Sequence, residues 1–444
     1  MTISFLTLFF GLLSGPLPVE MAVSGPAAAV EVTVDGGAPV RMTAPPWKAK
    51  IDFGPALLPH RIVARALDAK GHELARAEEW ANLPHPEAKA EIVLEGQKAG
   101  PPRAARVVWA SSLGETPEAT SLTFDGRPLK LDEAGRAVLP AHDLRSLHIL
   151  AAEVRFSAEK TVRADAAYGG QYGSEVSTEL TAVPVRVRSG ALPPPKALRG
   201  WFTGEGRPLS VAAVEEGPAQ LFVVRVPGAL EVDRKLGSQG TRPDDFEMRL
   251  GKEDSVRFLQ SSPNPVAGSD EPRDLFSLSG AYATSEGGLP WLLRGVGANK
   301  GAGPEGPAAA TQHPEIKRIA DAVAVAGLEV TTGNRRRAVL LVLNGDERDA
   351  SGYDVAAVRR YLAAIRVPFF VWTLSRPAPG SFAASWGAAE DVSAVKNLYR
   401  AFEELRGELR AQRIVLVNGR HLPQSVTLGL AARNVELAGG NGSP

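Results

Sequence analysis

Residues 337–374 read RAVLLVLNGDERDASGYDVAAVRRYLAAIRVPFFVWTL. The stretch opens with a continuous apolar run, Ala338–Leu343, which is typical of a strand buried on both faces of a parallel sheet. A segment with helical spacing follows at 355–365, and a second apolar strand follows at 368–372. This alternation of strand, helix and strand predicts an α/β domain built on a doubly wound sheet.

The alternation extends to both sides of this stretch. Further strands are predicted at 220–226, 255–259, 289–293 and 414–417, and further helices at 314–328 and 392–410. The α/β domain is therefore expected over 199–438, with a flexible tail at 439–444. Three consecutive prolines, Pro193–Pro195, favour an extended segment without internal hydrogen bonds, so residues 189–198 are interpreted as a Pro-rich linker.

A repeat organises the residues before that linker. Val32–Gly36 recurs as Leu122–Gly126, and each copy ends in an Asp-Gly pair, a strong hairpin signal because Gly accepts the positive φ of the turn. Each copy is followed by a histidine and an alternating strand, at His60 and His148. Duplicated units of short strands predict two all-β immunoglobulin-like sandwiches, at 1–86 and 87–188.

The first thirteen residues support two interpretations. Ile3–Leu13 has the length of the apolar core of a signal peptide, although no Lys or Arg precedes it. Alternatively, residues 3–6 form the first strand of the sandwich, and Leu17–Val23 forms the next strand with alternate residues on one face. The apolar run is shorter than the roughly 18 residues of a spanning helix, so an integral membrane span is excluded under both interpretations.

Two family resemblances follow from these motifs. The Ala44–Trp47 segment, the Asp-x-Gly step at Asp52 and the His60–Leu67 strand together resemble bacterial immunoglobulin-like modules of VWFA-related proteins. The element order over 337–374 resembles the von Willebrand factor type A fold. That resemblance implies adhesion or protein binding through a metal site with an Asp-x-Ser-x-Ser motif after the first strand. Here the first strand runs into Arg225–Ala229, which contains neither the Asp nor a Ser, so we expect a degenerate, metal-independent domain.

Three polar residues are candidates to face a ligand at the carboxyl edge of the sheet: Asn344, Asp346 and Asp349. Asn344 stands where the resemblance implies a carboxylate, and the two aspartates offer oxygen ligands of the kind that Mg²⁺ prefers. The alternative is that Asn344-Gly345 is a turn and that Asp349 to Ser351 supplies a helix cap. We expect no metal and no cofactor, and Mg²⁺ remains the alternative.

Composition and motifs narrow the function further. Lys plus Arg and Asp plus Glu are 50 each, so no surplus positive charge favours nucleic acid. The sequence contains no cysteine, no HExxH and no GxSxG, so no catalytic residue is assigned and no enzyme is expected. Trp47, Trp80 and Trp109 are interpreted as core residues, with carbohydrate stacking as the alternative. The expected function is an extracytoplasmic protein-binding or adhesion scaffold with a partner of unknown identity. The alternatives are a Mg²⁺-dependent adhesin and a structural envelope spacer.

Overall fold

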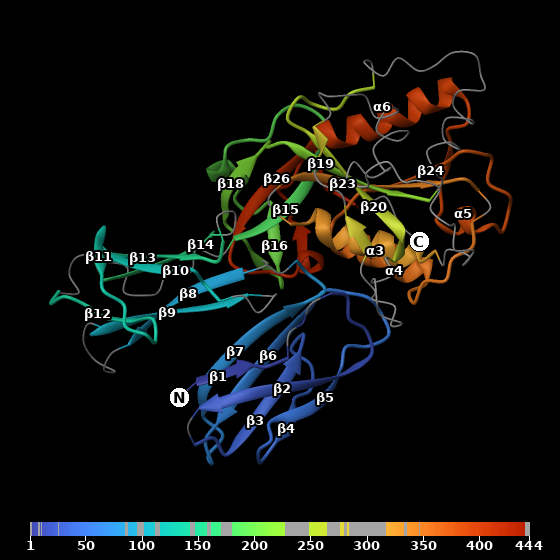
Figure 1. Cartoon of the computed structure of the whole chain (residues 1–444). Coiled ribbons are helices and arrows are strands. Elements are labelled where there is room, and N and C mark those ends of the chain that lie inside the picture. The colour runs from blue at the N-terminus through green and yellow to red at the C-terminus, as the bar shows by residue number, and fades with distance from the viewer. Residues whose placement is uncertain are drawn as a thin grey trace, which may run out of the picture. The chain divides into compact units, whose positions relative to one another are not determined.

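The structure is a computed structural model of a multidomain chain that is mostly β-sheet (Figure 1). It describes the whole chain except residues 1, 8, 10, 25, 85–87, 96–101, 112–115, 143–146, 158–160, 170–179, 227–247, 264–275, 279–281, 284–316, 333–334, 346 and 440–444. The described residues divide into two compact units, of which one comprises residues 1–84 with 180–444 and the other comprises 85–179. Among the described helices, none is long and apolar enough to cross a membrane.

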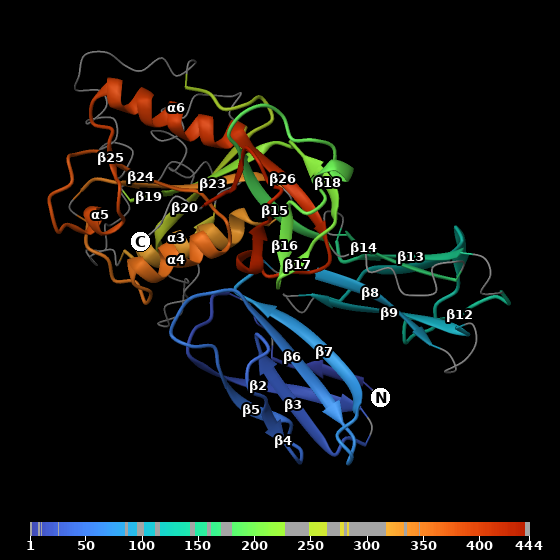
Figure 2. The same ribbon diagram turned by 180° about the vertical axis from the view of Figure 1, so that it is seen from behind.

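The first unit begins with an antiparallel sandwich of two sheets (Figure 2). One sheet has the order β1-β2-β5 and the other β4-β3-β6-β7. The strands are β1 Thr2–Phe5, β2 Pro16–Ser24, β3 Ala29–Val34, β4 Val40–Met42, β5 Lys48–Asp52, β6 His60–Leu67 and β7 Glu73–Ala81. Alternate residues such as Val30 and Val32 of β3 enter the core together with Val19 and Ile51 from the facing sheet. Ile3 of β1 is buried in the same core.

Residues 85–179 form the second sandwich. Its sheets have the orders β11-β10-β13-β14 and β12-β9-β8. The strands are β8 Ala88–Glu95, β9 Ala104–Ser111, β10 Ala119–Phe124, β11 Arg127–Leu129, β12 Arg136–Val138, β13 Leu147–Arg155 and β14 Thr161–Gly169. Leu122, Leu150 and Val154 are buried between the sheets with Val107.

Both Asp-Gly pairs of the repeat form the predicted turns. Asp35 and Gly36 have φ of 53° and 72°, and Asp125 and Gly126 have φ of 48° and 77°. Positive φ at both central residues is the conformation of a type I′ hairpin. In β10 and β11 the turn joins Phe124 directly to Arg127 in register.

A small β module not anticipated from the sequence is formed by segments that precede and follow the α/β domain in the chain. One sheet has the order β18-β26-β15-β28 and the other β17-β16-β27, and they share a core that contains Val183, Val185, Phe202 and Val415. The strands are β15 Leu180–Val187, β16 Phe202–Gly204, β17 Arg207–Pro208, β18 Val211–Glu215, β26 Gln412–Asn418, β27 Val426–Leu428 and β28 Val435–Leu437, with short 3-10 helices η1 Pro195–Leu198 and η3 Pro423–Ser425.

This module corrects three boundaries expected from the sequence. β15, expected to end the second sandwich at residue 188, pairs antiparallel with β26 over seven residues and with β28 over three. β26, expected to complete the parallel sheet, lies in the β module instead. The expected linker, 189–198, ends in η1, where Leu198 is fully buried. It is therefore packed against the module and does not act as a spacer.

Five parallel strands form the centre of the α/β domain. Their order is β20-β19-β23-β24-β25, and β21 and β22 pair antiparallel with β20. The strands are β19 Ala219–Arg225, β20 Ser255–Pro263, β21 Phe276–Leu278, β22 Tyr282–Ala283, β23 Arg336–Leu343, β24 Phe369–Thr373 and β25 Glu390–Asp391. The predicted strand at 289–293 lies outside the described residues.

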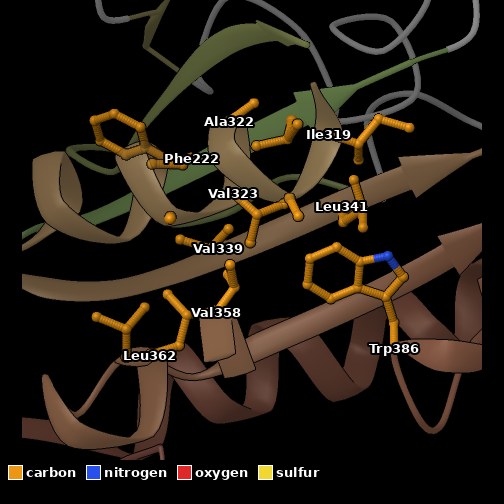
Figure 3. Packing of buried hydrophobic residues seen from close by; sticks show 14 of the residues in the cluster. Phe222, Ile319, Ala322, Val323, Val339, Leu341, Val358, Leu362 and Trp386 are labelled. Carbon is orange, nitrogen blue, oxygen red and sulfur yellow. The ribbon is translucent and has the colours of Figure 1, made fainter. Parts of the chain in front are cut away.

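Helices cover both faces of this sheet. They are α3 Ile319–Val330, α4 Val355–Ala364, α5 Phe382–Ser385 and α6 Val395–Ala411. α3 and α4 pack on one face with Phe222, Val339 and Leu341, as Figure 3 shows, while α6 packs on the other face with Leu221 and Leu340. Because successive residues of a strand point to opposite faces, the continuous apolar run of β23 supplies both cores.

Within the first unit the sandwich packs against the α/β domain through a buried asparagine. Asn82 has φ of 57°, and its side chain accepts from Leu13 N–H at 2.6 Å and donates to Leu13 O at 2.8 Å and Leu58 O at 2.6 Å. Its own carbonyl accepts a hydrogen bond from the hydroxyl of Tyr361 in α4 at 3.1 Å. Leu57 of the sandwich is buried in the core under α3 and α4. The sandwich and the α/β domain thus share a core.

Candidate functional site

The loop after β23 contains the residues predicted to face a ligand, and its polar groups bond to one another. The carboxylate of Glu347 accepts hydrogen bonds from the backbone N–H of Asn344 and, at 3.0 Å, from that of Gly345. The hydroxyl of Ser375 donates to the carbonyl of Asn344. The loop is therefore closed by a side chain, Glu347, that sequence reasoning missed.

Asp349 is occupied in a structural role. Its Oδ1 accepts from the N–H of Ile319, the first residue of α3, at 2.7 Å and from the Ser351 hydroxyl at 2.7 Å. The Ser351 hydroxyl in turn accepts from the backbone N–H of Asp321. The carboxylate of Asp321 accepts a hydrogen bond from Arg318. An acceptor at a helix N-terminus satisfies a backbone donor that has no partner within the helix. The structure thus supports the capping alternative, although the helix capped is α3.

The expected site is therefore only partly visible. The structure brings Asn344 to the carboxyl edge beside Glu347, turns Asp349 toward α3, and does not describe Asp346 or 227–229. Within the described part of the chain, no three His, Asp or Glu side chains are grouped so that they could hold a metal ion.

A cavity of about 530 Å³ lies elsewhere, along the first half of β24. We call it the β24 groove. One wall is the outer face of α4 with Arg359 and Arg360, the floor is Phe369–Val371, and the rim carries Ala388. The opposite wall is built by Glu408 of α6, by Arg186 of β15 and by the end of β28. This volume lies within the range of pockets that bind ligands.

The groove exists because β25 is short. Among the described residues, β25 pairs only with Trp372 and Thr373 of β24. Between α5 and β25 the chain turns at Gly387, whose φ of 94° favours glycine. The edge of β24 over residues 369–371 consequently has no strand beside it in the described chain.

Charges in the groove fall into two groups. On the β-module side, Arg186 contacts Glu408 at 3.1 Å and Glu436 at 3.0 Å, and Arg188 contacts Glu436 at 2.8 Å. Burial raises the pKa of Glu408, against the opposing effect of Arg186. Together these side chains form a neutral network that needs no further partner.

On the α4 side the charge is not neutralised. Arg359 and Arg360 are exposed, and neither has an ion pair or side-chain hydrogen bond within the described residues. The guanidinium of Arg359 lies over Gly387, where a Cβ would come within 3.2 Å of Nη2. The groove therefore combines an open strand edge, an aromatic floor and two cationic side chains.

No protein-family model matches the chain, and no curated protein matches it significantly. Among solved structures, the fibronectin(III)-like modules of Clostridium thermocellum CbhA are 13% identical, covering 38% of this chain and 94% of that one, with a TM-score of 0.15. The central fibronectin-III array of RIM-binding protein is 12% identical over 43% and 78% of the two chains, with a TM-score of 0.24. A 1.5-MDa bacterial ice-binding adhesin is 8% identical over 39% and 74%, with a TM-score of 0.15.

Each histidine of the repeat contacts the aspartate of the Asp-Gly turn in its own sandwich. His60 Nδ1 lies 2.7 Å from Asp35 Oδ2, and His148 Nδ1 lies 2.8 Å from Asp125 Oδ2. The other oxygen of each aspartate accepts the N–H of the residue after the histidine, at 2.8 Å in both sandwiches. Burial opposes a low pKa at Asp35, but these hydrogen bonds outweigh it, and they lower the pKa of Asp125 as well. The pairs hold each hairpin turn against the neighbouring strand.

Two of the three tryptophans predicted to lie in the core are packed there, and the third is partly exposed. Trp80 is 2% exposed and Trp47 is packed against the core of the first sandwich, as predicted for structural residues. Trp109 is 42% exposed and packs edge-on against Phe156. The indole of Trp80 also lies 4.7 Å from the guanidinium of Arg420, which adds a cation–π contact within the first unit.

Proposed function

We propose that this chain is a non-catalytic protein-binding or adhesion scaffold that acts outside the cytoplasm, with a metal-independent VWFA-like domain as its binding module. The observation that carries the proposal is the β24 groove. In the described chain its strand edge has no neighbouring strand and its two arginines have no ion pair, so it is a surface that a partner can complete. The sheet order and the helices on both faces support the VWFA-like assignment, since that resemblance implies a doubly wound sheet.

The location of binding differs from the one expected from the sequence. Open α/β sheets commonly bind ligands beyond the carboxyl ends of their strands. Here the backbone amides of Asn344 and Gly345 are bonded to Glu347, and Asp349 is bonded to α3. The groove at the other end of β24 offers two arginines without a charged partner among the described residues, so we assign binding to it.

Site-specific photo-crosslinking in living cells tests this proposal. A photoreactive amino acid at Ala388, exposed on the rim of the groove, should capture one defined protein. The same group at Leu430, which is fully exposed and does not line the groove, is the matched control. Capture at Ala388 should be lost when Arg359→Glu and Arg360→Glu are added.

Two results would contradict the proposal. Equal capture from Ala388 and Leu430 would show that the groove is not a binding surface. Capture that disappears with EDTA and returns with Mg²⁺ would favour the metal-dependent adhesin instead.

A further inference from the structure

We infer that the β24 groove binds an extended acidic segment of its partner, which adds to the parallel sheet as a strand beside residues 369–371. The inference rests on the proposed protein-binding function and specifies the chemistry of the segment. Three observations carry it: the direction of the free backbone groups, the two faces of the edge, and the charge of the α4 wall.

The backbone of β24 directs hydrogen-bonding groups into the groove. Thr373 O accepts from Val392 N at 2.8 Å on the β25 side, whereas Leu374 N donates to Leu343 O at 2.8 Å on the β23 side. Backbone groups of successive strand residues alternate in direction. Phe369 and Val371 therefore direct their N–H and C=O groups to the same side as Thr373. In the register that pairs Trp372 with Glu390, Val371 O accepts from β25, whereas the N–H of Val371 and both backbone groups of Phe369 lie beyond the end of β25. A peptide that forms a strand satisfies such an edge.

The side chains of an added strand would alternate between two environments. Phe369 and Val371 pack on the core under α3 and α4, and Phe370 packs on the core under α6. Side chains that neighbour each other across a strand pair lie on the same face of the sheet. Peptide residues beside Phe369 and Val371 thus point toward α4, and the residue beside Phe370 points toward α6.

The charges of the two walls then select the residue types. On the α4 side, Arg359 and Arg360 have no partner within the described residues, and arginine pairs well with carboxylates because its donors match both oxygens. On the α6 side, Glu408 is already bonded to Arg186, so a charged side chain would gain no partner there. The segment that fits alternates acidic residues with apolar ones.

Synthetic peptides and the full chain provide a direct test. The probe is acetyl-Ser-Glu-Val-Glu-Val-Ser-amide, and its charge control has Lys in place of each Glu. Calorimetry at low salt should show binding of the Glu peptide, with the Lys peptide at least about tenfold weaker. N-methylation of the valine between the two glutamates removes a backbone donor and should also weaken binding about tenfold if the peptide forms a strand.

Protein variants locate the binding. Arg359→Ala with Arg360→Ala should weaken binding of the Glu peptide at least about tenfold and reduce its salt dependence. Arg207→Ala, on exposed β17 outside the groove, is the matched control and should leave the affinity unchanged.

Each remaining outcome overturns the inference. Equal binding of the Glu and Lys peptides removes the acidic preference, and equal binding of glutarate and the Glu peptide removes the strand. Absence of peptide binding at millimolar concentration, while crosslinking from Ala388 persists, refutes the acidic strand and leaves the proposed function in place. Absence of any crosslinked protein from Ala388 in the otherwise unchanged chain refutes the proposed function itself.

Discussion

Replacing Asn82 by alanine should destabilise the protein far more than most single substitutions. Asn82 is completely buried, and three side-chain hydrogen bonds connect it to the backbone of Leu13 and Leu58. Truncation leaves one N–H and two carbonyls without their partner. Each lost hydrogen bond costs about 0.5–1.5 kcal/mol, and more where the remaining group stays buried.

The backbone adds a second cost. Asn82 has φ of 57°, in the left-handed region that asparagine tolerates and alanine disfavours by about 1 kcal/mol. The total expected loss in the free energy of unfolding is about 3–5 kcal/mol. Urea unfolding of the full chain, followed by tryptophan fluorescence, measures it because buried Trp80 lies two residues away.

Asn434 provides a control for the backbone term. It has the same φ of 57° but is exposed, with no side-chain hydrogen bond in the described structure. Asn434→Ala should therefore cost only about 1 kcal/mol. If Asn82→Ala costs no more than Asn434→Ala, the side-chain hydrogen bonds of Asn82 to Leu13 and Leu58 do not stabilise the first unit and the reasoning fails.

Three further predictions follow from the fold. Cleavage within 193–195 should leave both pieces together on a size-exclusion column, because β15 stays paired with β26, and separate elution without denaturant would contradict that pairing. Gly429→Ala should lower the free energy of unfolding by on the order of 1–3 kcal/mol, since its Cβ would lie 2.2 Å from Gly200 O. Gly407→Ala, which places a Cβ in open space, should not lower the free energy of unfolding. Hydrogen bonds lower the pKa of Asp125 below its usual 3.8, so its stabilisation is present above about pH 4 and is lost as pH falls through the lowered pKa. The stability difference between wild type and Asp125→Asn should accordingly shrink in acid, and a difference that grows there would be evidence against this pair.

The local elements were predictable from the sequence because their periodicity reflects burial. The continuous apolar run of β23 indicated a strand covered on both faces, and helices cover both. The Asp-Gly pairs indicated tight turns, because few residues accept positive φ at both central positions.

Strand partners were harder to predict. The apolar run of β26 has the pattern of a parallel core strand, yet it pairs antiparallel with β15 from more than two hundred residues away. Burial determines that pattern, and burial is similar in both sheets. The strand predicted at 414–417 is therefore present as β26, but it belongs to the β module and not to the parallel sheet.

The candidate site was the least predictable part. Sequence reasoning selected Asn344 and Asp349 from their position after a strand, but hydrogen bonds to Glu347 and to the start of α3 depend on how the loop folds back. The β24 groove depends on where β25 ends and on walls from segments far apart in the chain. The adjacent arginines in α4 were visible in the sequence, where exposed arginines of a helix are ordinary solvated residues.

Hydrogen–deuterium exchange of the full chain, with and without the Glu peptide, tests the central claim most directly. Binding as an added strand should slow exchange at the amides of Phe369 and Val371, which face the groove, and should leave the loop at 344–349 unchanged. Slowed exchange at 344–349 with no change at 369–371 would place the site at the carboxyl edge of the sheet and contradict the account.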